Sequence, residues 1–491
     1  MYNLNFEQEY KSNIFGIFDP ITMGLTLENL SELEKAVKKE QEEIIRIGQS
    51  YPGRYENALF EHQKKFHFYY RVRAHERAHW YTSISSSITI SRLFSDGDTF
   101  TNLTNAMQDY LLSSHDKIII PLGKWAQTSD CPEKLSKAVL TYNLDKYINS
   151  AIDGILLKEH LFDSNKFHIL NAYFPDLESF GDYWNSNVYK IGVKALIEGA
   201  GKAAEWLYFL RKDNSYENEA WDDIKNAQSI YNVALKQLIE VIPGLALLDY
   251  LQILCVLIDF SLNPYIYTKS WPFLWGEGNA KDLIPSFRFQ QLINLLSKNS
   301  IQKPFTKDNI ASLLTKYVQE ELGWQSHKSV SHQLLKLVKS GMMPGVEDTN
   351  LWNPLETIEK ALTIKTVDPM AYVPPVNSDM INTSGTYPQI ELTVGVANGP
   401  DTNILLVYIL RSLQTGFLND IVNIGSFRCP LIYNPWMAQL ARLKGLCKLG
   451  DSCYDRNLNK SINWYELRKC DFYESILTYF FERGIDRIKF L

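Results

Sequence analysis

The segment that most constrains this chain is His75-Glu76-Arg77-Ala78-His79, which has the pattern HExxH. On an α-helix, residues at i and i+4 lie on one face, so His75 and His79 can bind one metal ion together. Glu76 lies about 100° around the helix from His75, where its carboxylate can reach a metal-bound water without being a ligand. Zinc suits two imidazole ligands and needs at least one more protein ligand, with a last position open for water. The pattern therefore predicts a helical zinc site with Glu76 as general base.

The residues around the motif support this interpretation. Histidine is scarce, with 9 in 491 residues, so an HExxH pattern is improbable by chance. Apolar side chains follow the motif at once, including Trp80, Tyr81 and Ile84, which predicts that the helix is buried. Buried histidines need polar partners, and a metal ion is one such partner. The alternative is an amphipathic helix that carries two exposed histidines.

Composition and charge narrow the class of protein. The hydrophobic fraction of 45% and the charged fraction of 22% are typical of a folded globular protein. A net charge of −6 and a pI of about 5.9 argue against nucleic-acid binding through bulk charge. The first residues lack the basic-then-apolar pattern of a signal peptide, and six cysteines do not suggest a disulfide scaffold. These features predict a cytoplasmic protein with reduced thiols.

The longest apolar run, residues 241–260, is long enough to raise the question of a membrane span. Asp249 and Asp259 argue against one, because two carboxylates in a span are costly without partners. We therefore expect a buried core helix that starts near Pro243 and no membrane association.

Apolar periodicity predicts a mainly α-helical chain, an α+β protein with few short strands. Helices are expected over residues 31–47, 103–113, 132–158, 188–211, 307–321, 328–340, 353–363 and 403–423. Short strands are expected at 118–120 and 390–396, and Asp96-Gly97-Asp98 is expected to form a loop. We place a domain boundary near residue 298, with a catalytic domain over 1–298 and a mostly helical C-terminal domain over 299–491.

A second informative segment is ALIEGAGKAAEW, residues 195–206, on the helix expected at 188–211. Glu198 and Glu205 are separated by about two turns and share a face of that helix. The small residues between them permit close approach of another helix. Either glutamate could supply the third metal ligand, and the other could orient a histidine. The alternative is a tight helix–helix contact with two exposed glutamates.

HERAH followed by LIEGAGKAAEW resembles the gluzincin metallopeptidases, the thermolysin and aminopeptidase N type. In those enzymes a helix with a sequence like NEGFA supplies a glutamate ligand, and Glu198 in IEGAG matches it. The motif region is also similar to uncharacterised bacterial intracellular HExxH proteins. The resemblance covers two short segments and implies a zincin-like helical catalytic core. This chain departs from thermolysin in its longer insertion between the two motifs and at Lys202, where thermolysin-like enzymes have an aspartate that supports a histidine.

These observations together predict a zinc-dependent peptidase in which His75, His79 and Glu198 bind Zn²⁺ and Glu76 is catalytic. Glu205 is the candidate for a supporting contact to a histidine. The expected partners are a protein or peptide substrate and an activating or inhibitory protein, because a cytoplasmic peptidase must be kept harmless. A role in stress or phage defence would fit such a protease by fold-level analogy. The alternative function is a non-catalytic binding or scaffold protein with a structural or degenerate metal site.

Other candidate ligands are less informative. Cys429, Cys447, Cys453 and Cys470 could hold a structural zinc, but they lack a CxxC pair and are interpreted as free cysteines. His327 and His332 have the wrong spacing for one helical face, so we expect them to be structural or exposed. No oxyanion donor is identified from the sequence.

Overall fold

A computed structural model describes part of the 491-residue chain. The described residues are 16–19, 24–27, 31–50, 52–113, 118–120, 122–152, 191–266, 280–298, 305–340, 354–374, 390–393 and 488–490. The helix predicted over 403–423 and the cysteines at 429, 447, 453 and 470 lie outside them.

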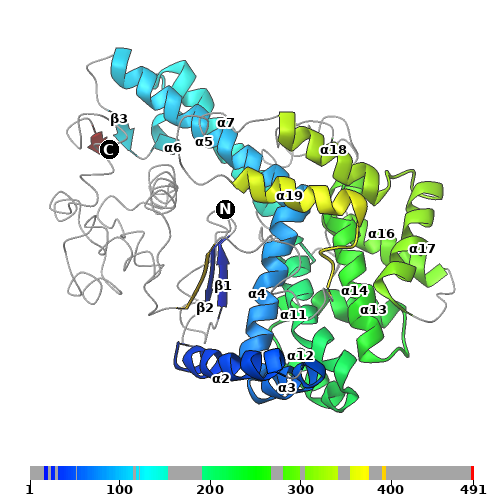
Figure 1. The fold of residues 1–491 in the computed structure, drawn as a ribbon. Helices are drawn as coiled ribbons and strands as arrows, with labels where there is room; N and C mark the ends of the chain where they lie inside the picture. The colour runs from blue at the N-terminus through cyan, green and yellow to red at the C-terminus, as the bar shows by residue number, and fades with distance from the viewer. Residues whose placement is uncertain are drawn as a thin grey trace.

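The described chain is mostly helical, as predicted (Figure 1). Its helices are α2 (Ser31–Ser50), α3 (Pro52–Lys65), α4 (His67–Ser85), α5 (Ser87–Ser113), α6 (Leu122–Trp125), α7 (Glu133–Ile152), α11 (Val193–Lys212), η3 (Asn214–Tyr216), α12 (Glu217–Asn226), α13 (Ser229–Val241), α14 (Leu247–Leu262), α15 (Ala280–Leu283), α16 (Pro285–Lys298), α17 (Lys307–Glu320), α18 (His327–Ser340) and α19 (Pro354–Val367). The strands are β1 (Gly16–Asp19), β2 (Gly24–Leu27), β3 (Ile118–Ile120), β4 (Ile390–Thr393) and β5 (Ile488–Phe490).

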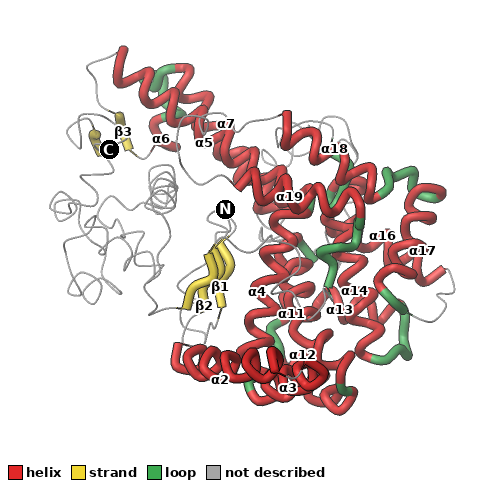
Figure 2. The backbone as a smooth tube through the Cα atoms, in the orientation of Figure 1, coloured by secondary structure: helices red, strands yellow, loops and turns green. Residues whose placement is uncertain are grey.

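The core is built around α14, which coincides with the long apolar run. Nearly all its side chains are buried, and it contacts α11, α13, α16 and α17 (Figure 2). This arrangement explains why the run is apolar on all faces, as expected of a helix surrounded by other helices. Among the described helices, none combines the length and apolarity that a membrane crossing needs.

The helix that carries the HExxH motif, α4, packs most extensively on α11. Small residues on α11 allow the close approach, including Gly201 and Ala204, which are both buried. Two helices whose backbones approach closely can place long polar side chains between them. The α4–α11 pair therefore positions every residue of the candidate site.

A small sheet lies beside α4 in the order β1-β2-β4 (Figure 2). Strands β1 and β2 are antiparallel, and β2 and β4 are parallel, with Gly24 opposite Ile390. Both β1 and β2 contact α4. The strand predicted at 390–396 is thus present in part, and the strand at 118–120 pairs with β5 in parallel.

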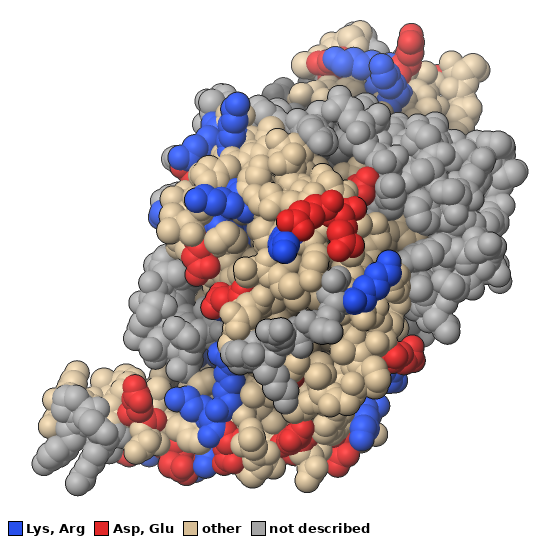
Figure 3. Space-filling model, turned by 90° about the vertical axis from the view of Figure 1, so that its right-hand side faces the viewer, with Lys and Arg blue, Asp and Glu red and all other residues tan. Residues whose placement is uncertain are grey.

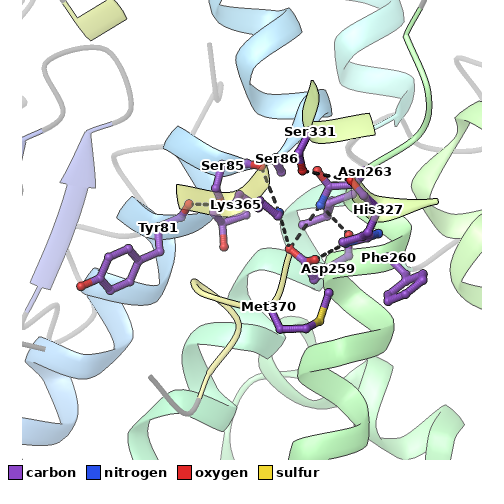
Figure 4. A network of polar contacts seen from close by, with 12 residues as sticks. Tyr81, Ser85, Ser86, Asp259, Phe260, Asn263, His327, Ser331, Lys365 and Met370 are labelled. Carbon is purple, nitrogen blue, oxygen red and sulfur yellow. Dashed lines mark hydrogen bonds and ion pairs between the residues drawn. The ribbon is translucent and has the colours of Figure 1, made fainter. Parts of the chain in front are cut away.

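The end of α4 is held by a buried polar network (Figure 4). Lys365 of α19 has its side chain 1% exposed, and its Nζ donates to the carbonyl of Ser85 at 3.1 Å and to Oδ1 of Asp259 at 3.0 Å. The other oxygen of Asp259 pairs with Nε2 of His327, whose ring stacks on Phe260 with centroids 4.1 Å apart. Four helices, α4, α14, α18 and α19, therefore meet at one charged cluster.

The predicted loop at Asp96-Gly97-Asp98 is wrong, because α5 continues through these residues as a helix. The break instead falls at Ser86, whose backbone is extended with φ −98° and ψ 142°. Asn263 accepts a hydrogen bond from the backbone N–H of Ser87 at 3.1 Å and so caps α5 from another helix end. A partner distant in sequence thus decides where the helix breaks.

Residues beyond the predicted boundary at 298 share the core with residues before it. Phe305, Ile310 and Leu314 belong to the same hydrophobic cluster as Leu254 of α14. Thr306 caps α17 by accepting a hydrogen bond from the N–H of Asn309 at 3.3 Å. The described part of the predicted C-terminal domain is therefore packed on the first.

Acidic and basic side chains are interspersed on the face drawn in Figure 3. Described acidic and basic side chains lie close together there, and the net charge of the whole chain is −6.

Candidate metal centre

The two motif histidines lie side by side on α4, as the HExxH spacing predicts. Their ring centroids are 4.6 Å apart with planes at 68°. The side chain of His75 is 10% exposed and that of His79 is 12% exposed. Both imidazoles thus face the α4–α11 contact and retain slight access to solvent.

Glu198 of α11 approaches both histidines from across the contact. Its Oε2 lies 3.1 Å from Nε2 of His75 and 3.3 Å from Nε2 of His79. One carboxylate oxygen is therefore shared by the same nitrogen of each ring. Two imidazoles and one carboxylate that meet at one point form the ligand set of His₂Glu catalytic zinc sites.

Glu205 approaches the opposite side of the His75 ring. Its Oε1 lies 2.8 Å from Nδ1 of His75, and its side chain is 11% exposed. A carboxylate that accepts the Nδ1 proton leaves Nε2 with its lone pair free for a metal. The geometry therefore favours Glu198 as the ligand and gives Glu205 the supporting position.

Glu76 offers a second candidate for a third donor. A ligand atom from each of His75, Glu76 and His79 lies within 4.8 Å of the others. The Oε2 of Glu76 is 3.5 Å from Nδ1 of His79, the nitrogen that faces away from Glu198 in the pairing described above. We favour Glu198 because its Oε2 lies 3.1 and 3.3 Å from the two Nε2 atoms, whereas Oε2 of Glu76 lies 3.5 Å from the opposite nitrogen, Nδ1, of His79.

Two features of the described residues fit a metal ion between these groups. The Nε2 of His79 is buried and makes no hydrogen bond, although it lies at ion-pair distance from Glu198. A Cβ atom at position 201 would lie 2.8 Å from Cε1 and Nε2 of His75, so the ring occupies space that only glycine leaves. A buried imidazole nitrogen without a hydrogen bond is what a metal-free ligand presents.

Contacts between the histidines and the glutamates of the site shift the pKa values of these groups. Burial by itself lowers the pKa of His75, but hydrogen bonds to Glu198 and Glu205 outweigh it and raise that pKa to about 10. Burial likewise opposes charge on Glu205, yet His75 and Lys202 lower the pKa of Glu205 to about 2. Burial also opposes the charge of Glu198, but the nearby His79 and His75 outweigh it and lower the pKa of Glu198. Without a metal, protons on the imidazoles balance the carboxylates.

Several residues around the site were not identified from the sequence. Arg71 donates to Oε2 of Glu205 at 3.1 Å, and Asp223 accepts a hydrogen bond from Arg71. The ring of Tyr231 packs edge-on against His75 with centroids 5.7 Å apart. Arg71 shares a helical face with His75 at i−4, which is a usable signal, whereas no pattern links Asp223 or Tyr231 to the motif.

The remaining histidines have other surroundings. His327 is buried against Asp259, and His332 is exposed with its ring against the carbonyl of Lys328 at 2.9 Å. Both agree with the expectation of structural or exposed positions, and neither contacts the α4–α11 site within the described residues.

Comparison of the chain with protein-family models, with curated proteins and with solved structures finds no match.

Proposed function

We propose that this protein is a zinc-dependent peptidase with a zincin-like core formed by α4 and α11. The observation that carries the proposal is the convergence of Nε2 of His75 and Nε2 of His79 on one oxygen of Glu198. Zn²⁺ bound there would polarise a carbonyl group and lower the pKa of a water molecule. The resemblance of HERAH and IEGAG to gluzincins favours a peptide carbonyl as the target.

Within this proposal the protein residues have separate tasks. His75, His79 and Glu198 hold the ion, and Glu205 keeps the His75 ring in one orientation through Nδ1. Glu76 is 6% exposed and next to the ligands, and it acts as the general base that takes a proton from water. The low exposure of the ligands limits competing solvent, which strengthens electrostatic interactions inside the site.

The sheet beside α4 offers a way to hold an extended substrate. Within the described residues, β1 and β4 are its edge strands. A peptide can add to such an edge through backbone hydrogen bonds. We further propose a protein or peptide substrate, a cytoplasmic location and control by an activating or inhibitory protein. A role in stress or phage defence belongs to the same proposal.

The test compares zinc-loaded wild-type protein with Glu76→Gln on a peptide library, with cleavage detected by mass spectrometry. We predict that Glu76→Gln retains its zinc and loses hydrolysis by about a hundredfold or more, since it removes the base but no ligand. Glu61→Gln is the matched control, because the Glu61 side chain is 71% exposed on α3.

Hydrolysis that survives Glu76→Gln, measured on a peptide that the wild type cleaves, would contradict the assigned role of Glu76. Zinc binding without hydrolysis of any library member would favour the alternative function, a binding or scaffold protein with a structural metal site.

A further inference from the structure

The carboxylate of Glu205 is held from its far side by two cations. Its Oε1 accepts from His75, and its Oε2 lies 3.1 Å from Nη2 of Arg71 and 3.0 Å from Nζ of Lys202. The side chains of Arg71 and Lys202 are 10% and 12% exposed. Every oxygen of Glu205 therefore has a charged or hydrogen-bonding partner, and the carboxylate has little freedom to turn.

The two cations are in turn fixed by a second carboxylate, Asp223 of α12. Its Oδ2 lies 2.5 Å from Nη2 of Arg71 and 2.6 Å from Nζ of Lys202. The indole Nε1 of Trp206 donates to the same oxygen at 2.8 Å. The guanidinium of Arg71 also lies 3.6 Å from the centroid of the Trp206 ring. Asp223 thus closes a network that begins at His75.

Helical spacing brings these groups together. Arg71 precedes His75 by one turn on α4 and pairs with Glu205 across the helix contact. Lys202 precedes Glu205 by one turn on α11 and pairs with Glu205 and with Asp223 of α12. Beyond His75, the positive charges of Arg71 and Lys202 face the negative charges of Glu205 and Asp223. Because these charges balance, Glu205 can remain ionised although it is buried.

We propose that Lys202, Arg71 and Asp223 are positioning residues that hold the Glu205 carboxylate against Nδ1 of His75 and so fix the nitrogen offered to zinc. This inference rests on the zinc site of the proposed function. Lys202 stands where thermolysin-like enzymes have an aspartate that supports a histidine. Here Glu205 contacts the histidine, and Lys202 holds Glu205 in place.

The physical reason is orientation. A ligating imidazole binds best when its other N–H donates to a fixed acceptor, which sets both the tautomer and the ring plane. Removing a cation from this network leaves Glu205 buried beside an unbalanced Asp223. Either the carboxylate turns away from His75 or the two acidic groups separate, and both outcomes loosen the ring.

The experiment measures zinc affinity by chelator competition and the visible absorption of the Co²⁺-substituted full-length protein. We predict that Lys202→Met weakens zinc binding by about 10–100-fold without changing the stoichiometry. It should also shift the Co²⁺ bands, which report the ligand geometry and would not respond to a purely structural role. Lys202→Arg keeps the charge and should recover most of the affinity. Lys212→Met, at the exposed end of α11, is the control.

Asp223→Asn provides a second test in case Lys202→Met does not fold. The Asp223 side chain is 33% exposed, so the fold should tolerate this change better. We predict weaker zinc binding toward the lower end of that ~10–100-fold range. Wild-type affinity within about twofold and unchanged Co²⁺ bands in both variants would overturn the positioning roles and leave the zinc site standing. A wild-type protein that binds no zinc would overturn both proposals.

Discussion

Gly201 determines how closely the His75 ring can lie against α11. A Cβ atom there would lie 2.8 Å from Cε1 and Nε2 of the ring, which is closer than non-bonded atoms pack. Gly199, two residues earlier on the same helix, has no such constraint, because its Cβ would meet Cδ1 of Ile258 at an ordinary 3.7 Å. Two nearby glycines on one helix therefore have different roles, one of them at the site.

We predict that Gly201→Ala weakens zinc binding by about tenfold or more, whereas Gly199→Ala leaves the affinity nearly unchanged. The added methyl group displaces the His75 ring, which is the flexible end of a side chain, so the fold itself should tolerate the change. Alanine favours a helix over glycine by about 1 kcal/mol, which offsets part of any packing cost. Chelator competition and urea unfolding of both metal-free variants provide the check. Equal zinc affinities in the two variants would count against the position of His75 described above.

At the same scale, the sequence predicts the central residues of the site better than their surroundings. The spacing of His75 and His79 predicts that the rings share a face, and they do. The choice between Glu198 and Glu205 stays open in the sequence because two turns on one helix place both toward α4. Only the side-chain directions separate them, with Glu198 at Nε2 and Glu205 at Nδ1 of His75.

At the scale of elements, the C-terminal end of α4 depends on a charge supplied by α19. Lys365 donates to the carbonyl of Ser85, one of the carbonyls that a helix end leaves without a partner, and pairs with Asp259. Arg288 has the same role at the end of α14, where Nη2 donates to the carbonyl of Phe260 at 2.7 Å. Buried cations thus terminate both central helices, and neither contact follows from local sequence.

We predict that Lys365→Met lowers the free energy of unfolding by about 3–5 kcal/mol, because it leaves the Asp259 charge buried without its lysine partner, with only His327 beside it. The double variant Lys365→Met/Asp259→Asn removes both charges and should lose less than the single variant. Lys339→Met breaks a surface pair with Glu359, whose side chains are 53% and 44% exposed, and should cost at most about 1 kcal/mol. Urea unfolding measures these three variants and the single variant Asp259→Asn. A double variant that loses the sum of its two single losses would argue against the coupling.

The same network predicts an acid-sensitive contribution to stability. Burial opposes the charge of Asp259, but Lys365 and His327 outweigh it and lower the pKa of Asp259 to about 2. A carboxyl group whose pKa is lower in the folded state stabilises the fold above its unfolded pKa near ~4, and this contribution is lost as the pH falls toward 2. The stability difference between wild type and Asp259→Asn should therefore shrink over that range. Unfolding free energies at several acidic pH values test it, and a constant difference would contradict it.

Helix positions follow from the sequence more closely than helix ends. The core helix and the described helices between residues 307 and 367 fall where apolar periodicity predicts them, and the motif helix falls where the HExxH spacing predicts it. The predicted loop at Asp96-Gly97-Asp98 fails because α5 continues through three residues that usually favour turns. The actual break at Ser86 depends on Asn263, which no local pattern reveals.

For the whole molecule, α4 is the element that joins the candidate site to the rest of the fold. Its middle faces α11 with the motif residues, and its last turns contribute Trp80, Tyr81 and Ile84 to a hydrophobic cluster with α18 and α19. Residues beyond 298 therefore support the helix that carries the histidines. The division into domains at 298 stays a prediction. Described residues on its two sides belong to one hydrophobic cluster.

The central claim is that HERAH and Glu198 form one zinc site, and elemental analysis of untagged protein tests it most directly. We predict one zinc per chain in the wild type, loss of tight binding in His75→Ala and Glu198→Ala, and at most a ~10–100-fold weakening in Glu205→Ala. A second zinc would point to the cysteines at 429, 447, 453 and 470. Substoichiometric metal that does not respond to His75→Ala would contradict the account.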